Sequence, residues 1–159
     1  MVKRCLIEFC HELEKMAESK KLDGLIKRLH KIGVSDDEFI IAGSAAIKKN
    51  YPDFREIDDL DVIVSPPAFK RLAQSGKLIK WSGGTVKRGL RTSDDAIEMA
   101  TRFRNIPFRS YMGGGRSSVV DGVRTISMPV ALKWKIEAGR TKDIPDAEFL
   151  KKKGVQPSK

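Results

Sequence analysis

The sequence predicts an α+β (α/β) fold in which helices at both ends of the chain flank a β-sheet. Three observations predict it. Before residue 33, apolar residues recur every three or four positions, which is the spacing of amphipathic helices. Short β-branched and apolar runs separated by turn residues fill residues 39–127. A second helical pattern follows from residue 128.

Length and composition favour a single domain. The 159 residues, 40% of them hydrophobic, suffice for one core but not for two domains with a linker. We divide the chain into an N-terminal helical segment (1–33), a sheet core (39–127), C-terminal helices (128–150) and a basic tail (151–159).

We expect a cytoplasmic protein with no membrane contact. The apolar runs are far shorter than the roughly 20 residues of a membrane span, and acidic residues interrupt the N-terminus before a signal-peptide core could form. Cys5 and Cys10 lie five positions apart, so on a helix they point in different directions, and we expect reduced thiols.

The formal net charge of +10 creates a positive field around the protein. Such a field attracts nucleotides, nucleic acids or an acidic protein partner, without selecting among them. Part of the excess lies in the tail of residues 151–159, which we expect to be frayed and solvated.

The first half of the chain is predicted to alternate helices and strands. Two helices, or one interrupted helix, are expected between residue 6 and about residue 31. Phe39–Ala42 is of strand type, and Gly43-Ser44 forms a tight turn into a helix. The next strand is residues 60–64, after which Ser65 can cap a helix that ends at Gly76.

The second half contains several short strands and two helices. The strand candidates are residues 78–81, 85–90, 96–101, 106–109 and 123–127. A glycine-rich stretch at residues 113–115 lacks the context of a phosphate-binding loop, so we interpret it and the serines after it as a flexible loop.

Two caps are predicted near the C-terminus. Ser127 is expected to cap a helix with Pro129 in its first turn and Gly139 just past its end. Asp143 is expected to cap a final short helix opened by Pro145, a role compatible with a second one in a functional site.

Asp59 and Asp61 are the strongest sign of chemistry. Residues two apart on a strand project from the same face, so the two carboxylates lie close together and repel each other. A cation would offset that repulsion. Mg²⁺ suits the position because it prefers one or two carboxylates together with substrate phosphates and water.

Two further features favour function over a solvated turn. Gly43 and Ser44 break a strand into a helix, where backbone amides and a hydroxyl could meet a triphosphate. Glu98 places an acid inside another apolar strand, and it becomes a third metal ligand if that strand lies beside residues 60–64. Asp95 competes with Glu98 for this assignment.

The sequence Ile40-Ile41-Ala42-Gly43-Ser44, followed by residues 58–64 (Asp-Asp-Leu-Asp-Val-Ile-Val), resembles the motif of the polymerase β-type nucleotidyltransferase superfamily. The likeness covers roughly residues 39–101. It implies a mixed central β-sheet flanked by helices and a Mg²⁺ or Mn²⁺ cofactor. By position, Gly43 and Ser44 would contact phosphates of a nucleoside triphosphate, and Asp59, Asp61 and Glu98 would bind the metal.

Residues 128–146 resemble a segment of the small abortive-infection and toxin-type nucleotidyltransferases, in which a lysine-bearing helix runs into Ala-Gly-Arg-x-Lys-Asp and a second aspartate three residues on, here Asp146. That resemblance implies an active-site role for Lys135, with Asp143 as its partner. It also places Arg140 near the nucleotide.

The resemblance implies transfer of a nucleoside monophosphate to an acceptor hydroxyl, and it leaves the acceptor open. A tRNA or another nucleic acid fits the charge, and its phosphates could be contacted by Arg88, Arg91, Arg102, Arg104 and Arg109. A protein or a small molecule is also compatible. Two other functions remain: an inactive nucleotide- or RNA-binding module, and a basic adaptor whose acidic pairs are surface features.

Overall fold

The computed structural model describes residue 10, residues 21–84 and residues 86–159. The predictions for residues 1–9 and 11–20, among them the first helix and Cys5, lie outside these ranges. Residues 21–31 form a helix. The other helices are α2 (Gly43–Asn50), α3 (Pro66–Gln74), α4 (Phe108–Tyr111), α5 (Met128–Ala138) and α6 (Asp143–Lys152).

Seven strands form one mixed sheet in the order β3-β4-β5-β2-β1-β9-β8, and two form a small separate ribbon. The main sheet consists of β1 (Phe39–Ala42), β2 (Leu60–Val64), β3 (Ile79–Gly83), β4 (Val86–Arg91), β5 (Ile97–Ala100), β8 (Ser117–Val120) and β9 (Val123–Ile126). The ribbon pairs β6 (Arg102–Phe103) with β7 (Ile106–Pro107). The predicted α+β class with a mixed central sheet is confirmed.

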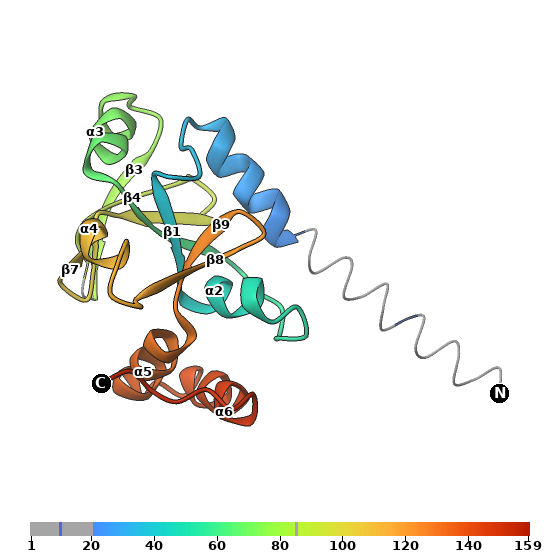
Figure 1. The fold of residues 1–159 in the computed structure, drawn as a ribbon. Helices are drawn as coiled ribbons and strands as arrows, with labels where there is room; N and C mark the ends of the chain where they lie inside the picture. The colour runs from blue at the N-terminus through green and yellow to red at the C-terminus, as the bar shows by residue number, and fades with distance from the viewer. Residues whose placement is uncertain (1–9, 11–20, 85) are drawn as a thin grey trace.

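The sheet is mixed because β1 pairs antiparallel with β2 but parallel with β9, and β2 pairs parallel with β5. Its central strands β1 and β2 are almost fully buried, which explains why every residue in them except Asp61 is apolar. Helix α2 contacts β1, β2 and β9 as well as α5. Figure 1 shows α5 and α6 together at the α2 end of the molecule, away from α3.

None of the helices within the described part of the chain is long and apolar enough to cross a membrane.

The structure confirms most of the predicted strands and corrects two regions. The strand predicted at residues 106–109 is only β7, after which Phe108 begins the short helix α4. The serines assigned to a flexible loop instead form β8, which pairs with β9. Polar serines suit this position because β8 lies at the edge of the sheet, where its residues are only partly buried or exposed.

One predicted cap forms and another does not. The Ser65 side chain accepts a hydrogen bond from the Ala68 amide at 3.4 Å. Ser127 precedes α5, but its side chain makes no capping bond, and its buried Oγ has no hydrogen-bond partner among the described residues.

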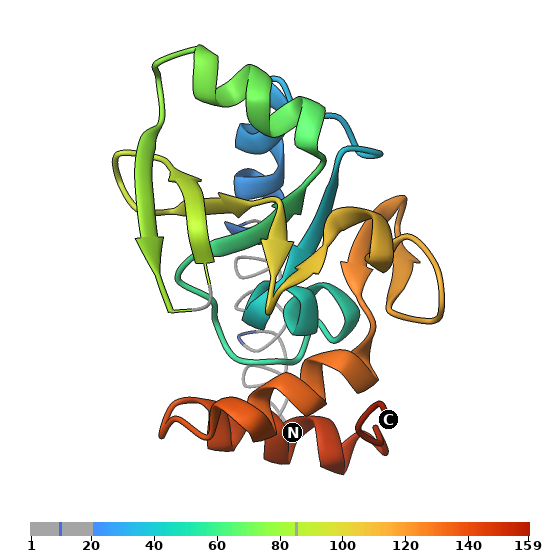
Figure 2. The ribbon, with the colours of Figure 1, turned by 90° about the vertical axis from the view of Figure 1, so that its left-hand side faces the viewer.

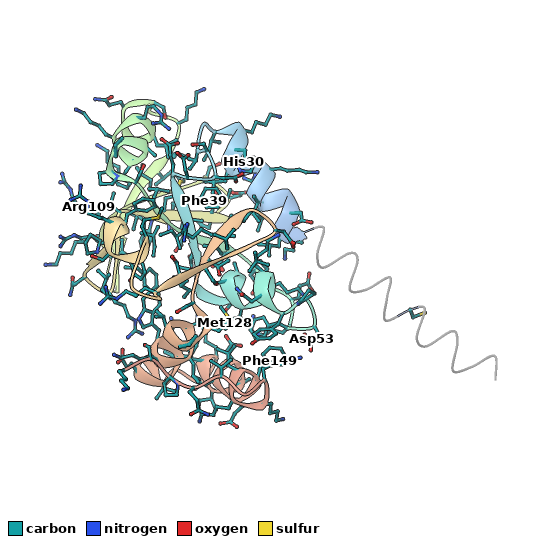
Figure 3. The ribbon with its side chains drawn as sticks, viewed as in Figure 1. His30, Phe39, Asp53, Arg109, Met128 and Phe149 are labelled. Carbon is teal, nitrogen blue, oxygen red and sulfur yellow. The ribbon has the colours of Figure 1, made fainter. Side chains whose placement is uncertain are left out.

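The C-terminal tail is docked, so the expectation of a frayed tail is wrong. Lys153 pairs with Asp53 at 2.7 Å, and Val155 packs against the core. The Ser158 amide donates to the Pro129 carbonyl at 3.1 Å, at the start of α5. Figure 3 labels Asp53, in the loop after α2, and Phe149, on α6, in the same part of the view.

Deleting residues 153–159 should lower the free energy of unfolding by about 1–2 kcal/mol, because buried apolar area and backbone hydrogen bonds are lost together. Lys153→Ala alone should cost less than about 1 kcal/mol, since a partly exposed ion pair contributes little. Urea denaturation of the three proteins measures both values. Equal stability of the full and shortened chains would contradict the docking.

Candidate active site

A pocket of about 920 Å³ is lined by residues of the sheet and of the helices α2, α5 and α6. It brings together every residue predicted for the functional site. These are Gly43, Ser44, Asp59, Asp61, Glu98, Lys135, Arg140 and Asp143.

Gly43 lies directly against Asp61. Strands β1 and β2 are antiparallel with Ala42 opposite Asp61, so the turn after β1 meets the start of β2. Gly43 has φ of +59°, and a Cβ built on it would lie 2.8 Å from Oδ2 of Asp61. Glycine is therefore required at position 43 for two reasons: the backbone is left-handed, and the Asp61 carboxylate occupies the space of a side chain.

Asp61 and Glu98 are neighbours across the parallel pair β2 and β5, where they occupy matching register positions. Burial raises the pKa of Asp61 to about 7, with further contributions from the charges of Asp59 and Glu98. The pKa of Glu98 is also raised, first by burial and then by Asp59. The two carboxylates therefore resist carrying full charge together.

Asp59 is exposed at the rim of the pocket. Within residues 10, 21–84 and 86–159, no three acidic, histidine or cysteine side chains converge as a ready metal site. The assignment of Asp59, Asp61 and Glu98 as metal ligands therefore stays a prediction.

Asp95 and Glu98 have different surroundings. Asp95 lies in the turn before β5 with φ of +58°, is exposed, and pairs with Arg91 at 3.2 Å. It does not line the pocket, whereas Glu98 does. Of the two acids, Glu98 is the one beside Asp61.

Lys135 on α5 lines the same pocket as these acids. Its ammonium contacts Asp143 Oδ1 at 3.0 Å and Asp146 Oδ2 at 2.8 Å, and it donates to Ser44 Oγ at 3.1 Å. The side chains of both aspartates have no exposed surface. Ser44 thus connects the start of α2 to the two C-terminal helices.

Asp143 lies in the first turn of α6 and does not cap it, because Lys142 occupies the cap position. The carboxylate is instead bound by Lys135 and by the Arg140 guanidinium, the latter at 2.5 and 3.2 Å. Burial raises the pKa of Asp143, but hydrogen bonds from Arg140 and Lys135 more than offset it, so the net pKa is lowered. The prediction that Asp143 caps this helix is wrong, because its carboxylate is bound by the Lys135 and Arg140 side chains instead.

Arg55 and Asp146 belong to the same network. Arg55 was not predicted, and Asp146 was expected only as the second aspartate of the motif in residues 128–146, without a role. Arg55 forms a two-pronged contact with Asp146, at 2.7 and 2.9 Å, and donates to Ser44 Oγ at 2.9 Å. Burial raises the pKa of Asp146, yet hydrogen bonds from Arg55 and Lys135 lower it overall. Asp146 has a sequence signal, since it follows Asp143 by three positions on one helix face. Arg55 lies in the loop before β2, and nothing in its local sequence marks it.

No protein-family model and no curated protein sequence matches the chain. Its structure is similar to the crystal structure of ANT(2″)-Ia in complex with adenylyl-2″-tobramycin, with a TM-score of 0.52 over 79% of this chain and 86% of that one. The two sequences are 18% identical. ANT(2″)-Ia is an aminoglycoside nucleotidyltransferase.

The chain has a nucleotidyltransferase-type fold.

The five arginines expected to contact a nucleic acid are not gathered at the pocket of this nucleotidyltransferase-type fold. Only Arg104 lines it, where it donates to Glu137 and to the Trp134 carbonyl, each at 3.0 Å. Arg91 is paired with Asp95, and Arg109 lies on α4 at the outer side of the molecule (Figure 3).

Gly43→Ala should destabilise the protein by about 1–2 kcal/mol more than Gly139→Ala, a matched control. Gly139 has φ of +58°, and the nearest atom to an added Cβ is 3.7 Å away. Both variants carry the cost of left-handed backbone, but only Gly43→Ala must also displace the Asp61 carboxylate. Urea denaturation compares them, and equal losses would show that the contact with Asp61 relaxes without cost.

Asp61→Asn should stabilise the protein at pH 8 by on the order of 1–3 kcal/mol. The folded pKa of about 7 exceeds the ordinary 3.8, so the folded state binds more protons between these values. The contribution of Asp61 to stability is therefore fully present below about pH 4 and lost as the pH rises through 7. Denaturation midpoints measured from pH 4 to 8 give the loss of stability as the pH rises. The Asp61→Asn protein should not show this loss, whereas the exposed control Asp95→Asn should show it as the natural protein does.

Proposed function

We propose that this protein is a metal-dependent nucleotidyltransferase that moves a nucleoside monophosphate from a nucleoside triphosphate to an acceptor hydroxyl. One observation carries the proposal: the Asp61 and Glu98 pair, the Gly43-Ser44 turn and Lys135 line the same pocket. The carboxylates form an anionic side, and the turn with its neighbouring cations forms a cationic side. A triphosphate with a divalent cation is complementary to both.

The cationic side would receive the triphosphate. Helix α2 begins at Gly43 without a side-chain cap and without acidic residues in its first turn, so its N-terminus favours an anion. Lys135, Arg55 and Arg140 surround the carboxylates of Asp143 and Asp146, which leaves one net positive charge. The side chains of Arg55 and Arg140 are 43% and 59% exposed, so both can turn towards phosphate oxygens.

Asp61 and Glu98, with Asp59 at the rim, would hold Mg²⁺ or Mn²⁺. The residues fit such an ion, because a divalent cation removes the repulsion that contributes to the raised pKa of both Asp61 and Glu98. Two carboxylates plus substrate phosphates also match the ligands that Mg²⁺ prefers. When bound, the metal would neutralise phosphate charge and lower the pKa of the acceptor hydroxyl.

The reaction needs no covalent enzyme intermediate. The acceptor oxygen would bond to the α-phosphorus, the bond from that phosphorus to the oxygen bridging to the β-phosphate would break, and pyrophosphate would leave. The acceptor proton would pass to solvent. Ser44 and Lys135 would stabilise the negative charge that develops on the leaving phosphates.

We also propose a closer relation to the abortive-infection and toxin-type enzymes, which the arrangement of the C-terminal helices supports. Lys135 and Asp143, the expected partners, are 3.0 Å apart, and Asp146 adds a second contact to the same ammonium. The adenylyl group in the similar ANT(2″)-Ia structure makes ATP the first donor to test.

Incubation of the protein with Mg²⁺ and each α-labelled nucleoside triphosphate, with total RNA or total protein as acceptor, tests the proposal. We expect label transfer by the natural protein and by Asp95→Asn. Glu98→Gln should lower the rate at least about 100-fold, because it removes a charge that acts in the transition state.

Three results would contradict parts of this proposal. Full activity of Glu98→Gln would exclude Glu98 as the third acid, and loss of activity in Asp95→Asn would assign that role to Asp95. Tight nucleotide binding without any transfer would instead favour an inactive nucleotide-binding module.

A further inference from the structure

The chain between Asp61 and Asp94 carries positive charge only. Residues 62–93 contain seven lysines and arginines and no acidic residue. The seven are Lys70, Arg71, Lys77, Lys80, Lys87, Arg88 and Arg91. The segment includes α3 and the β3–β4 hairpin, and β3 is an edge strand of the sheet. This segment therefore adds basic residues, and no acidic ones, at the β3 edge of the sheet.

Most of this charge has no acidic partner. Arg71 pairs with Glu38, and Arg91 pairs with Asp95. In the described part of the chain no ion pair involves the other five. Three of those five, Lys80, Lys87 and Arg88, are exposed on the hairpin. Like charges that repel one another on two neighbouring strands are stabilised by an anion that lies across both of them.

The hairpin lies on the far side of the carboxylates from the Gly43-Ser44 turn. Along the sheet, the order β3-β4-β5-β2-β1 places the hairpin first, then Glu98, then Asp61, and finally the turn after β1. Figure 2 shows the hairpin at the edge of the sheet opposite β8 and β9. A group that approaches the carboxylates of Asp61 and Glu98 from the hairpin therefore comes from one side, and the cationic network around Ser44 lies on the other side.

One face of the sheet connects Trp81 to the carboxylates. Directly paired residues share a face, and the register pairs Trp81 with Gly89 and Gly89 with Ala100. Ala100 follows Glu98 by two positions on β5, so both project from this face. The hairpin lines the pocket through Trp81, Gly83, Gly84 and Val86.

Trp81 forms a flat aromatic wall at this end of the pocket. Its indole lies over Gly89, where an added Cβ would be only 2.6 Å from Nε1, and Nε1 donates to the Leu90 carbonyl at 3.2 Å. The ring is therefore fixed against the sheet, while the side chain remains partly exposed.

The three unpaired basic residues lie on the reverse of the same hairpin. Lys80 precedes Trp81 and so projects from the other face. Between the pairs Trp81–Gly89 and Gly83–Val86, β4 has one residue more than β3, so Lys87 and Arg88 both lie opposite Ser82. Because β3 is the outermost strand, an extended ligand that contacts Trp81 on one face can pass over the edge of the sheet and contact these cations on the other face. A small acceptor could contact only one of the two faces.

We propose that the acceptor is a single-stranded nucleic acid whose end base stacks on Trp81 and whose phosphates pass over the edge of the β3–β4 hairpin to Lys80 and Lys87. A fixed ring beside unpaired cations is the combination that proteins use to bind such strands. This inference rests on the proposed function, because it assigns the acceptor of that reaction. It brings the terminal hydroxyl to Glu98 from the side opposite the triphosphate. An acidic protein could also contact the lysines, and competition by polyglutamate is therefore one outcome of the test.

Fluorescence anisotropy with a short labelled RNA, and with DNA of the same sequence, tests the surface in buffer without metal or nucleotide. Trp81→Ala should weaken binding of at least one of them about tenfold, and Trp81→Phe should retain most of it. Lys80→Glu with Lys87→Glu should reduce the slope of log K against log salt concentration by about 0.7 for each lost phosphate contact. The matched control is Lys27→Glu with Lys152→Glu, which changes two exposed lysines on other elements.

The proposal is overturned if neither nucleic acid binds, if the control pair loses as much affinity as the hairpin pair, or if polyglutamate competes as well as RNA. Thermal melting of each variant separates loss of binding from loss of folding.

Failure of the proposed function is distinguishable, because binding is measured without chemistry. Nucleic acid bound at the hairpin but never labelled would contradict the transferase. Label transferred to another acceptor without nucleic-acid binding would contradict the hairpin surface alone.

Discussion

The site depends on two buried carboxylates that must be neutralised. Asp143 and Asp146 have no exposed surface, and a buried charge without partners is costly. Lys135 reaches both of them, Arg55 reaches Asp146 from the loop before β2, and Arg140 reaches Asp143. These contacts join three separate parts of the chain, and through Ser44 they fix where the C-terminal helices lie relative to the start of α2.

The sheet imposes the second constraint. Asp61 and Glu98 are far apart in the sequence, yet the parallel register of β2 and β5 makes them neighbours. The antiparallel pairing of β1 with β2 brings Gly43 to the same point. The anionic side of the pocket, and the position of the Gly43-Ser44 turn beside it, are thus produced by strand order and not by local sequence.

The sequence predicts the site best where chemistry requires particular residues at short spacing. The pair of Lys135 and Asp143 was expected only from the resemblance of residues 128–146. It lines the same pocket as Asp59, Asp61 and the Gly43-Ser44 turn, which are predictable in this way. Arg55 is not, because its partners lie 11 and 91 positions away. The strand β8 was missed because an edge strand needs no alternation of apolar and polar residues. The docked tail was missed because its many charges suggest solvation, whereas a few specific contacts hold it.

The ammonium of Lys135, which two aspartates share, bears on how a product of the proposed reaction would leave. Three free cations would hold a polyanion tightly, and release often limits the rate of an enzyme. Here Asp143 and Asp146 already compensate two of the three positive charges, which leaves one net positive charge. In the proposed reaction, a departing pyrophosphate would be replaced by carboxylates already beside the same groups, so the protein itself would supply the counter-ions for the next reaction cycle.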